Sequence, residues 1–222
     1  FQHELYDRFL AASYDRGHSH TEDFNGAQQE GFGRYQCTLK DGRRSSSSAA
    51  FLTKEVRARP NLKIVTNAHV TQVVLDGKKV TGVEYVVGRS KKTAACSKEV
   101  ILSAGAIKSP HILQTSGIGR REDLEKAGIA VKHELAGVGH NMQEHLDLLM
   151  NFSLTKPIGL NDTATKIHLQ IKTGLEYFLF NKGVATYNMI EAGGFVRSTE
   201  QEAIPDLQLH FIPINMDGLI DP

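Results

Sequence analysis

The stretch from residue 99 to residue 119 constrains the fold of this chain more than any other part of the sequence. Residues 99–103, Glu-Val-Ile-Leu-Ser, are nearly all apolar, which is typical of a strand buried on both faces of a sheet. The strand runs into Ala104-Gly105, and Ser109-Pro110 then offers an N-cap and a first helical residue. The sequence therefore predicts a buried strand, a glycine turn and a capped helix that ends in Gly117-Ile118-Gly119.

This turn has the features of a binding site for a nucleotide cofactor. Small residues allow the backbone to approach something flat or extended, and a helix N-terminus presents unpaired N–H groups with a partial positive charge. A tight strand-to-helix connection without any ligand would use the same residues. The physical pattern alone leaves both interpretations open.

The N-terminal part of the chain predicts two helices separated by a long loop. Residues 4–16 place Leu5, Phe9 and Leu10 at helical spacing, which indicates an amphipathic helix that ends near Gly17. Residues 18–42 are rich in Gly, His, Asn and Gln and are expected to form an ordered loop. Residues 43–52 could form a low-complexity linker, but the start of a second helix is preferred, because the serines can supply N-cap oxygens.

The middle of the chain predicts strands and then a short helix. Residues 62–66, 69–75 and 80–87 are rich in β-branched residues, and Asp76-Gly77 between the last two is a hairpin signal. Residues 121–126, followed by Gly128, are expected to form a helix.

The composition changes after about residue 150. A helix is expected over residues 164–180, and strands are expected over residues 194–196 and 206–214. We therefore expect an α/β part over residues 1–149 and a mixed part over residues 150–222.

Composition excludes several classes of protein. The formal charge of +1 gives no reason to expect nucleic acid as a partner, and no apolar run approaches the roughly 18 residues that a membrane helix needs. Cys37 and Cys96 have neither metal-type spacing nor a disulfide framework, so reduced thiols in a cytosolic chain are expected. We predict no metal site, because the spacing of His140 and His145 does not place them on one helical face. A loop site at His18 and His20 stays open.

Residues 105–119 resemble the second signature of the glucose-methanol-choline (GMC) oxidoreductase family at every defined position. The signature fixes Gly-Ala, then Ser-Pro, two aliphatic residues, and Ser-Gly-aliphatic-Gly. Further segments resemble the family in the expected order: 42–52, 59–66, 137–146, 191–198 and 205–211. The segments 191–198 and 205–211 are similar to the family's choline and aliphatic-alcohol dehydrogenases.

The resemblance implies FAD as the cofactor and an α/β fold (α+β overall). Residues 1–149 would be an incomplete, Rossmann-like part of the FAD-binding domain, and residues 150–222 part of an antiparallel-sheet substrate domain. The resemblance places the backbone of Val70 against the adenine and Ser103, Ala104 and Gly105 beside the adenosine half. It places Asn141 and His145 close to the cofactor.

The resemblance also implies a substrate-facing role for Glu191. Choline-oxidising relatives carry a carboxylate at this position, and a carboxylate can attract a quaternary ammonium or polarise the site during hydride loss. The same Glu-Ala-Gly segment is also found in relatives that act on aliphatic alcohols, so it does not decide the substrate. A solvated charge at the edge of a strand is the alternative interpretation.

Two parts of the family's catalytic unit have no counterpart in these residues. No Gly-x-Gly-x-x-Gly follows an N-terminal strand, and no histidine falls in the family's catalytic motif, so we assign no catalytic residue. We expect the chain to be the central fragment of an enzyme that oxidises a primary alcohol, choline or an aliphatic alcohol, and to be inactive alone. A non-catalytic binding module or truncated product is the alternative.

The expected location is the bacterial cytoplasm, with peripheral membrane association of the longer enzyme as an alternative. The particular alcohol, the electron acceptor and the oligomeric state do not follow from the sequence.

Overall fold

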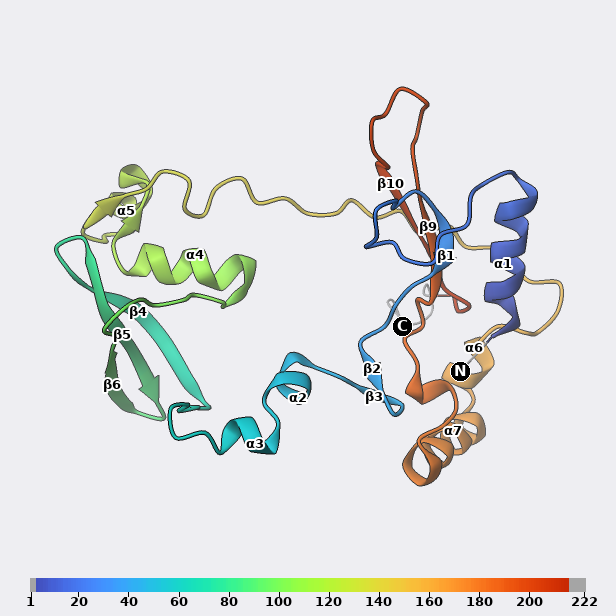
Figure 1. Ribbon diagram of the computed structural model, residues 1–222, viewed down its shortest axis with the longest axis horizontal. Coiled ribbons are helices and arrows are strands. Elements are labelled where there is room, and N and C mark those ends of the chain that lie inside the picture. Colours follow the sequence, from blue (N-terminus) through green and yellow to red (C-terminus); the bar gives the residue numbers. More distant parts are fainter. Residues whose placement is uncertain (1–2, 216–222) are drawn as a thin grey trace. The chain divides into compact units, whose positions relative to one another are not determined.

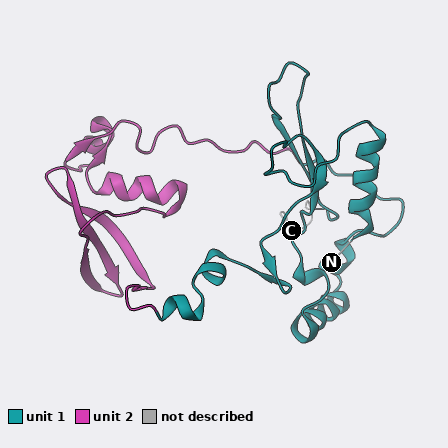
Figure 2. Ribbon diagram, viewed as in Figure 1, with its two compact units in different colours: residues 1–58, 149–222 teal, residues 59–148 magenta. Residues whose placement is uncertain are grey.

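The computed structural model describes residues 3–215, which form two compact units (Figures 1 and 2). The first unit combines residues 1–58 with residues 149–222, and the second unit comprises residues 59–148. Both contain helices and antiparallel sheet, which agrees with the mixed fold class that the sequence predicts.

The first unit opens with helix α1 (Glu4–Asp15), as predicted. The ring of His3 accepts a hydrogen bond from the Leu5 N–H and so caps the helix, and acidic residues in the first turn complement the helix dipole. One face of α1 is buried through Leu5, Tyr6 and Leu10. The helix therefore forms because its apolar stripe has a sheet to cover.

That sheet is antiparallel and has the order β1 (Gly31–Arg34), β9 (Ala192–Val196), β10 (Leu207–Phe211). The prediction of a continuous loop over residues 18–42 was wrong at β1 and at the short strand Leu39–Lys40. Gly-Phe-Gly-Arg has little β propensity of its own, and the strand exists because β9 pairs with it. At Gly193 a Cβ atom would clash with the carbonyl of Leu209, so glycine permits the close pairing of β9 with β10. The strands predicted near residues 194 and 206 are confirmed.

Aromatic rings join α1 to this sheet. The rings of Phe9 and Phe211 stack with their centroids 4.6 Å apart, and Tyr6 meets Phe211 edge-on at 5.7 Å. Tyr6, Leu10, Phe32 and Ala192 form the buried cluster between helix and sheet. This core fixes the first unit from segments that are far apart in the sequence.

Short elements complete the first unit: β2 (Leu39–Lys40), β3 (Arg43–Arg44), α2 (Ser47–Phe51), α3 (Lys54–Arg57), α6 (Asn161–Thr165), α7 (Ile167–Phe180) and η1 (Val184–Thr186). Ser46 caps α2 through its hydroxyl, which confirms the predicted role of the serines. The helix predicted over residues 164–180 is α7, separated from α6 by the extended backbone of Lys166. Its end is set by Asn181, which adopts the left-handed conformation.

The second unit contains an antiparallel sheet of β4 (Ala68–Asp76), β5 (Lys79–Val87) and β6 (Ser90–Ala95). The predicted hairpin is confirmed, with Asp76 paired to Lys79 and a positive φ at Gly77. Strand β6 was not predicted, because Ser-Lys-Lys-Thr-Ala-Ala lacks apolar alternation and is exposed throughout. The remaining elements are α4 (Gly105–Thr115), β7 (Ile118–Gly119), α5 (Arg121–Lys126) and β8 (His133–Glu134).

Two hydroxyl groups at the end of α4 attach this helix to β4. The hydroxyl of Ser116 accepts a hydrogen bond from the Val73 N–H at 2.8 Å, and the hydroxyl of Thr115 donates to the Thr71 carbonyl at 2.9 Å. Around these bonds the apolar side chains of Val73, Ile112, Ile118 and Val138 form the core of the second unit.

Two predicted strands, over residues 62–66 and 99–103, were wrong. Neither segment pairs with another described strand, and Ile101 is 76% exposed. Val100 and Leu102 still pack against the core of the second unit, so only one side of this apolar segment is covered by other residues. A buried strand requires neighbours on both edges, and the described residues supply none here.

The predicted start of α4 was also wrong. The helix begins at Gly105, and Ser109 and Pro110 lie inside it instead of opening it. The hydroxyl of Ser109 accepts a hydrogen bond from the Ala104 N–H at 3.0 Å, so this serine stabilises the helix start from within the helix.

The two compact units match the predicted division near residue 150 but differ from it at the N-terminal end of the chain. The second unit ends at Leu148, next to that boundary, but residues 1–58 pack with the C-terminal part of the chain through the β1–β9 pair. The assignment of residues 1–149 to a cofactor domain and residues 150–222 to a substrate domain stays a prediction.

Replacement of Ser116 tests the attachment of α4 to β4. The Ser116→Ala variant leaves the N–H of Val73 without its acceptor in a buried position, which is expected to cost about 1–3 kcal/mol of unfolding free energy. Urea unfolding measures this loss. The Thr115→Ser control keeps its hydroxyl and is expected to cost less than about 1 kcal/mol. Equal losses in the two variants would contradict the proposed attachment.

Candidate functional site

Residues 103–105 lead into the start of α4 in the second unit and are exposed. No side chain caps the start of this helix from the N-cap position, which Ala104 occupies. Gly105 has a φ of +88°, and a Cβ atom there would meet nothing within 4 Å. The helix start therefore combines N–H donors, a partial positive charge and open space above a residue without a side chain.

Val70 is anchored to the same core as this turn. It is half-buried on β4 and packs against the cluster around Val73 and Ile112. Leu102, which directly precedes Ser103, packs against the same cluster. Two of the segments predicted to bind the cofactor, at Val70 and at residues 103–105, are thus attached to the same hydrophobic core.

Asn141 and His145 lie in a segment that follows this core. Val138 is part of the buried cluster, and its carbonyl accepts a hydrogen bond from the side-chain amide of Gln114 on α4 at 3.4 Å. Asn141 adopts a positive φ of 59°, and residues 141–150 are exposed and belong to no helix or strand. The backbone N–H of His145 donates to the Glu144 carboxylate at 2.9 Å. The anchor at Val138 therefore holds the start of this segment and leaves His145 exposed.

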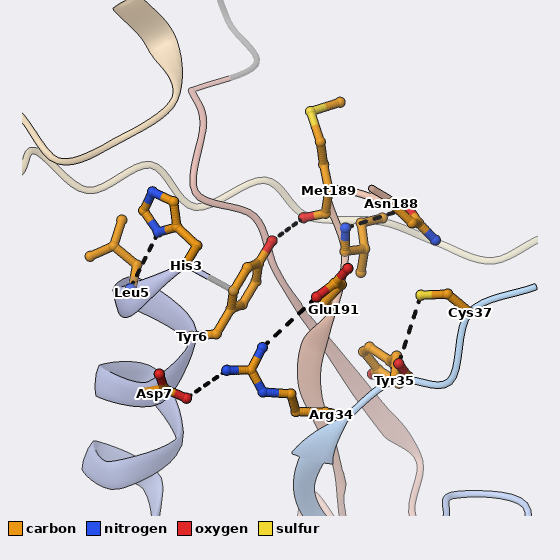
Figure 3. A network of polar contacts seen from close by, with 11 residues as sticks. His3, Leu5, Tyr6, Asp7, Arg34, Tyr35, Cys37, Asn188, Met189 and Glu191 are labelled. Atoms are coloured by element: carbon orange, nitrogen blue, oxygen red, sulfur yellow. Dashed lines mark hydrogen bonds and ion pairs between the residues drawn. The ribbon is translucent and has the colours of Figure 1, made fainter. Parts of the chain in front are cut away.

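Glu191 belongs to the first unit and directly precedes β9 (Figure 3). Its carbonyl accepts the Tyr35 N–H at 2.8 Å, which extends the β1–β9 pair by one bond. Its side chain is only 17% exposed, and an oxygen of the carboxylate lies 3.8 Å from Nη1 of Arg34. Arg34 also pairs through Nη2 with Asp7 at 2.5 Å. The strand pairing thus places an arginine of β1 against the carboxylate.

Aromatic and polar groups surround this pair (Figure 3). The Tyr6 hydroxyl donates to the Met189 carbonyl at 2.7 Å, and the guanidinium carbon of Arg34 lies 5.4 Å from the centroid of the Tyr6 ring. The thiol of Cys37 is free and donates to the Tyr35 carbonyl at 3.7 Å. The site therefore combines two carboxylates, one guanidinium and several aromatic and neutral polar side chains.

Burial controls the protonation of these groups. It raises the pKa of the Glu191 carboxyl, while the nearby Arg34 charge acts in the opposite direction. Burial raises the pKa of the Cys37 thiol, and the negative charge of Glu191 adds to that effect. Burial also raises the pKa of Tyr187, and the neighbouring Tyr6 contributes. The thiol of Cys37 and the phenol of Tyr187 are therefore expected to be neutral near neutral pH, so neither adds a negative charge beside Arg34.

Sequence reasoning found Glu191 but missed Tyr6, Asp7 and Arg34 as its neighbours. Tyr6 and Asp7 read as part of an amphipathic helix, and Arg34 lay in a segment predicted to be a loop. The strand predicted over residues 194–196 gave the only signal, and it did not identify the partner strand.

The histidines singled out in the sequence have other partners. The Nδ1 atom of His20 lies 2.6 Å from the Tyr14 hydroxyl, and Nε2 of His140 lies 2.8 Å from the Asp123 carboxylate. Within residues 3–215, no three His, Cys, Asp or Glu side chains are grouped as a metal site would require. None of the helices in this described range has the length and apolar character needed to cross a membrane.

Comparison with known proteins assigns a family to these features. The GMC oxidoreductase profile matches residues 2–147. The chain is 44% identical to "Oxygen-dependent choline dehydrogenase 1" of Chromohalobacter salexigens, over 95% of its own length and 38% of the relative's. It is 43% identical to the oxygen-dependent choline dehydrogenase of Serratia proteamaculans, over 97% of its own length and 39% of the length of that relative. The chain thus spans well under half the length of these curated relatives.

Solved structures share the fold. An FAD-dependent oxidoreductase from Chaetomium thermophilum superposes with a TM-score of 0.73 at 25% identity, covering 88% of this chain and 35% of that one. The formate oxidase of Aspergillus oryzae superposes with a TM-score of 0.80 at 21% identity, and the match covers 95% of this chain and 40% of the oxidase chain.

The raised pKa of Glu191 predicts how stability depends on pH. The folded state binds this proton more strongly than the unfolded chain, whose Glu pKa is about 4.3, so the carboxyl favours folding in acid. That contribution is lost as the pH rises through the raised, folded-state pKa. The Glu191→Gln variant should therefore gain stability relative to the parent as the pH increases from about 4 to about 8.

Asp206 provides a control of opposite sign for this measurement. Hydrogen bonds from the hydroxyl and the N–H of Ser198, at 2.6 and 2.7 Å, lower the pKa of this carboxyl. Its contribution to stability is present at neutral pH and is lost in acid, so Asp206→Asn should lose stability relative to the parent as the pH rises. Thermal unfolding at a series of pH values measures both variants. The same slope for both would contradict the assignment.

Proposed function

Because this chain belongs to the GMC oxidoreductase family, we propose that it is the central part of a flavoprotein that oxidises a primary alcohol to the aldehyde with FAD. The relatives named choline dehydrogenase support an alcohol substrate, and the solved FAD-dependent oxidoreductase of the same fold supports the cofactor. The catalytic activity is that of the longer protein, since the chain spans 38% of its curated relative.

The observation that carries this proposal is the start of α4. Exposed N–H groups, a partial positive charge and a glycine with open space above it suit the adenosine half of FAD, as the family signature over residues 105–119 implies. The residues proposed to hold the cofactor are Val70, Ser103, Ala104, Gly105, Asn141 and His145. Bound FAD would accept the hydride that leaves the alcohol carbon.

Glu191 is proposed to face the alcohol substrate. Its low exposure keeps the carboxylate poorly screened by water, so it acts strongly on whatever binds beside it. The histidine motif that the resemblance implies for the catalytic base does not occur in residues 1–222, and we assign no base among them. Choline and neutral aliphatic alcohols are the two substrate classes that this site could serve.

Two glycine variants of the flavoprotein test the cofactor site. A Gly105→Ala substitution strains a residue with φ +88° and adds a methyl group where the cofactor is proposed to lie, so FAD affinity should fall by about tenfold or more. Gly128→Ala is the matched control, because its φ is +72° and its Cβ would likewise meet nothing within 4 Å. Both variants carry similar strain, but only the first should lose FAD in a fluorescence titration. Equal FAD affinities would argue against this site.

The reaction itself is tested by flavin absorbance. Anaerobic addition of a substrate alcohol should bleach the bound flavin, because the hydride reduces it. A protein that copurifies without FAD and binds none on titration would instead support the alternative of a non-catalytic binding module.

A further inference from the structure

We propose that Arg34 determines substrate specificity by compensating the charge of Glu191, so that the site accepts neutral primary alcohols in preference to cationic ones such as choline. This inference rests on the proposed function, because it requires Glu191 to face the alcohol. It concerns a residue that no sequence motif singled out.

The distance between the two groups is the first argument. The Nη1 atom of Arg34 lies 3.8 Å from Oε2 of Glu191, and the two side chains are 33% and 17% exposed. Charges so poorly exposed are only weakly screened by water. A quaternary ammonium that approached the Glu191 carboxylate would also approach a guanidinium of like charge.

Two contacts hold the guanidinium and strand pairing holds the backbone, so Arg34 cannot easily move away. Its Nη2 atom pairs with Asp7 at 2.5 Å, its guanidinium lies over the Tyr6 ring, and its backbone pairs with Ala192 in the β1–β9 ladder (Figure 3). Displacing it from Glu191 would disturb contacts to both α1 and the sheet. The arginine is therefore part of the resting site.

The charges around the pair lead to the same conclusion. Asp7 is the second carboxylate that contacts Arg34, but its side chain is 68% exposed, so its charge acts on a ligand through more water than that of Glu191, which is 17% exposed. Cys37 and Tyr187 have raised pKa values and are neutral near pH 7. A bound substrate would thus encounter a Glu191 carboxylate whose charge is offset by the adjacent guanidinium, together with apolar rings, which suits an uncharged alcohol.

The test uses two alcohols of the same shape. Choline and 3,3-dimethylbutan-1-ol differ only in a quaternary nitrogen against a quaternary carbon, so the ratio of their kcat/KM values reports the charge preference. The ratio is taken on one preparation of the FAD-loaded flavoprotein. Partial unfolding or FAD loss therefore cancels, and a merely structural role of Arg34 would not change it.

The parent protein is expected to favour the neutral alcohol. Arg34→Met should raise the ratio of choline to neutral alcohol by about tenfold, mainly through a lower KM for choline. Arg34→Gln removes the charge but keeps a hydrogen-bond donor for Asp7, and it should act in the same direction if the methionine variant folds poorly. Arg34→Lys keeps the charge and should leave the ratio within about twofold of the parent.

Two outcomes separate the inference from the proposed function. An unchanged ratio in both neutral variants, or a parent enzyme that prefers choline, would overturn the role of Arg34 while alcohol oxidation stands. A flavoprotein whose FAD is reduced by no alcohol would overturn the proposed function, and the specificity inference with it.

Discussion

The backbone pairing of β1 with β9 is the contact on which the first unit depends. It joins the N-terminal and C-terminal parts of the chain and gives α1 a sheet to cover. The same register places Arg34 opposite Ala192, next to Glu191, and lets the Glu191 carbonyl accept the Tyr35 N–H. The charge of the candidate substrate site therefore depends on strand pairing, because the pairing of β1 with β9 places Arg34 beside the Glu191 carboxylate.

A different constraint organises the second unit. Hydroxyl groups of Thr115 and Ser116 hold the C-terminal end of α4 on β4, so the N-terminal end of the helix does not need to pack against the core. That end stays exposed, and Gly105 leaves open space where a side chain would otherwise project. A rigid attachment at one end of a helix can thus present its other end, with its N–H groups, to a ligand.

The sequence predicted helices and turns correctly where their formation is determined by the residues within them. The hairpin at Asp76-Gly77, the serine cap before α2 and the amphipathic helix α1 were all predicted correctly. Predictions failed where a strand needs partners elsewhere. Residues 62–66 are rich in β-branched residues and residues 99–103 are apolar enough for a buried strand, but neither segment pairs with a described strand. Gly31–Arg34, in contrast, has weak β propensity and is a strand because β9 pairs with it.

The sequence by itself determined the family, through the signature over residues 105–119, and thereby pointed to FAD and to Glu191 as a candidate carboxylate. Only the tertiary structure decided what surrounds that carboxylate. Tyr6, Asp7 and Arg34 are far from Glu191 in the chain, and none stands in a motif that links them to it. The physical reason is that a motif encodes local geometry, whereas the charge balance of this site arises from side chains that long-range sheet pairing and helix packing bring together.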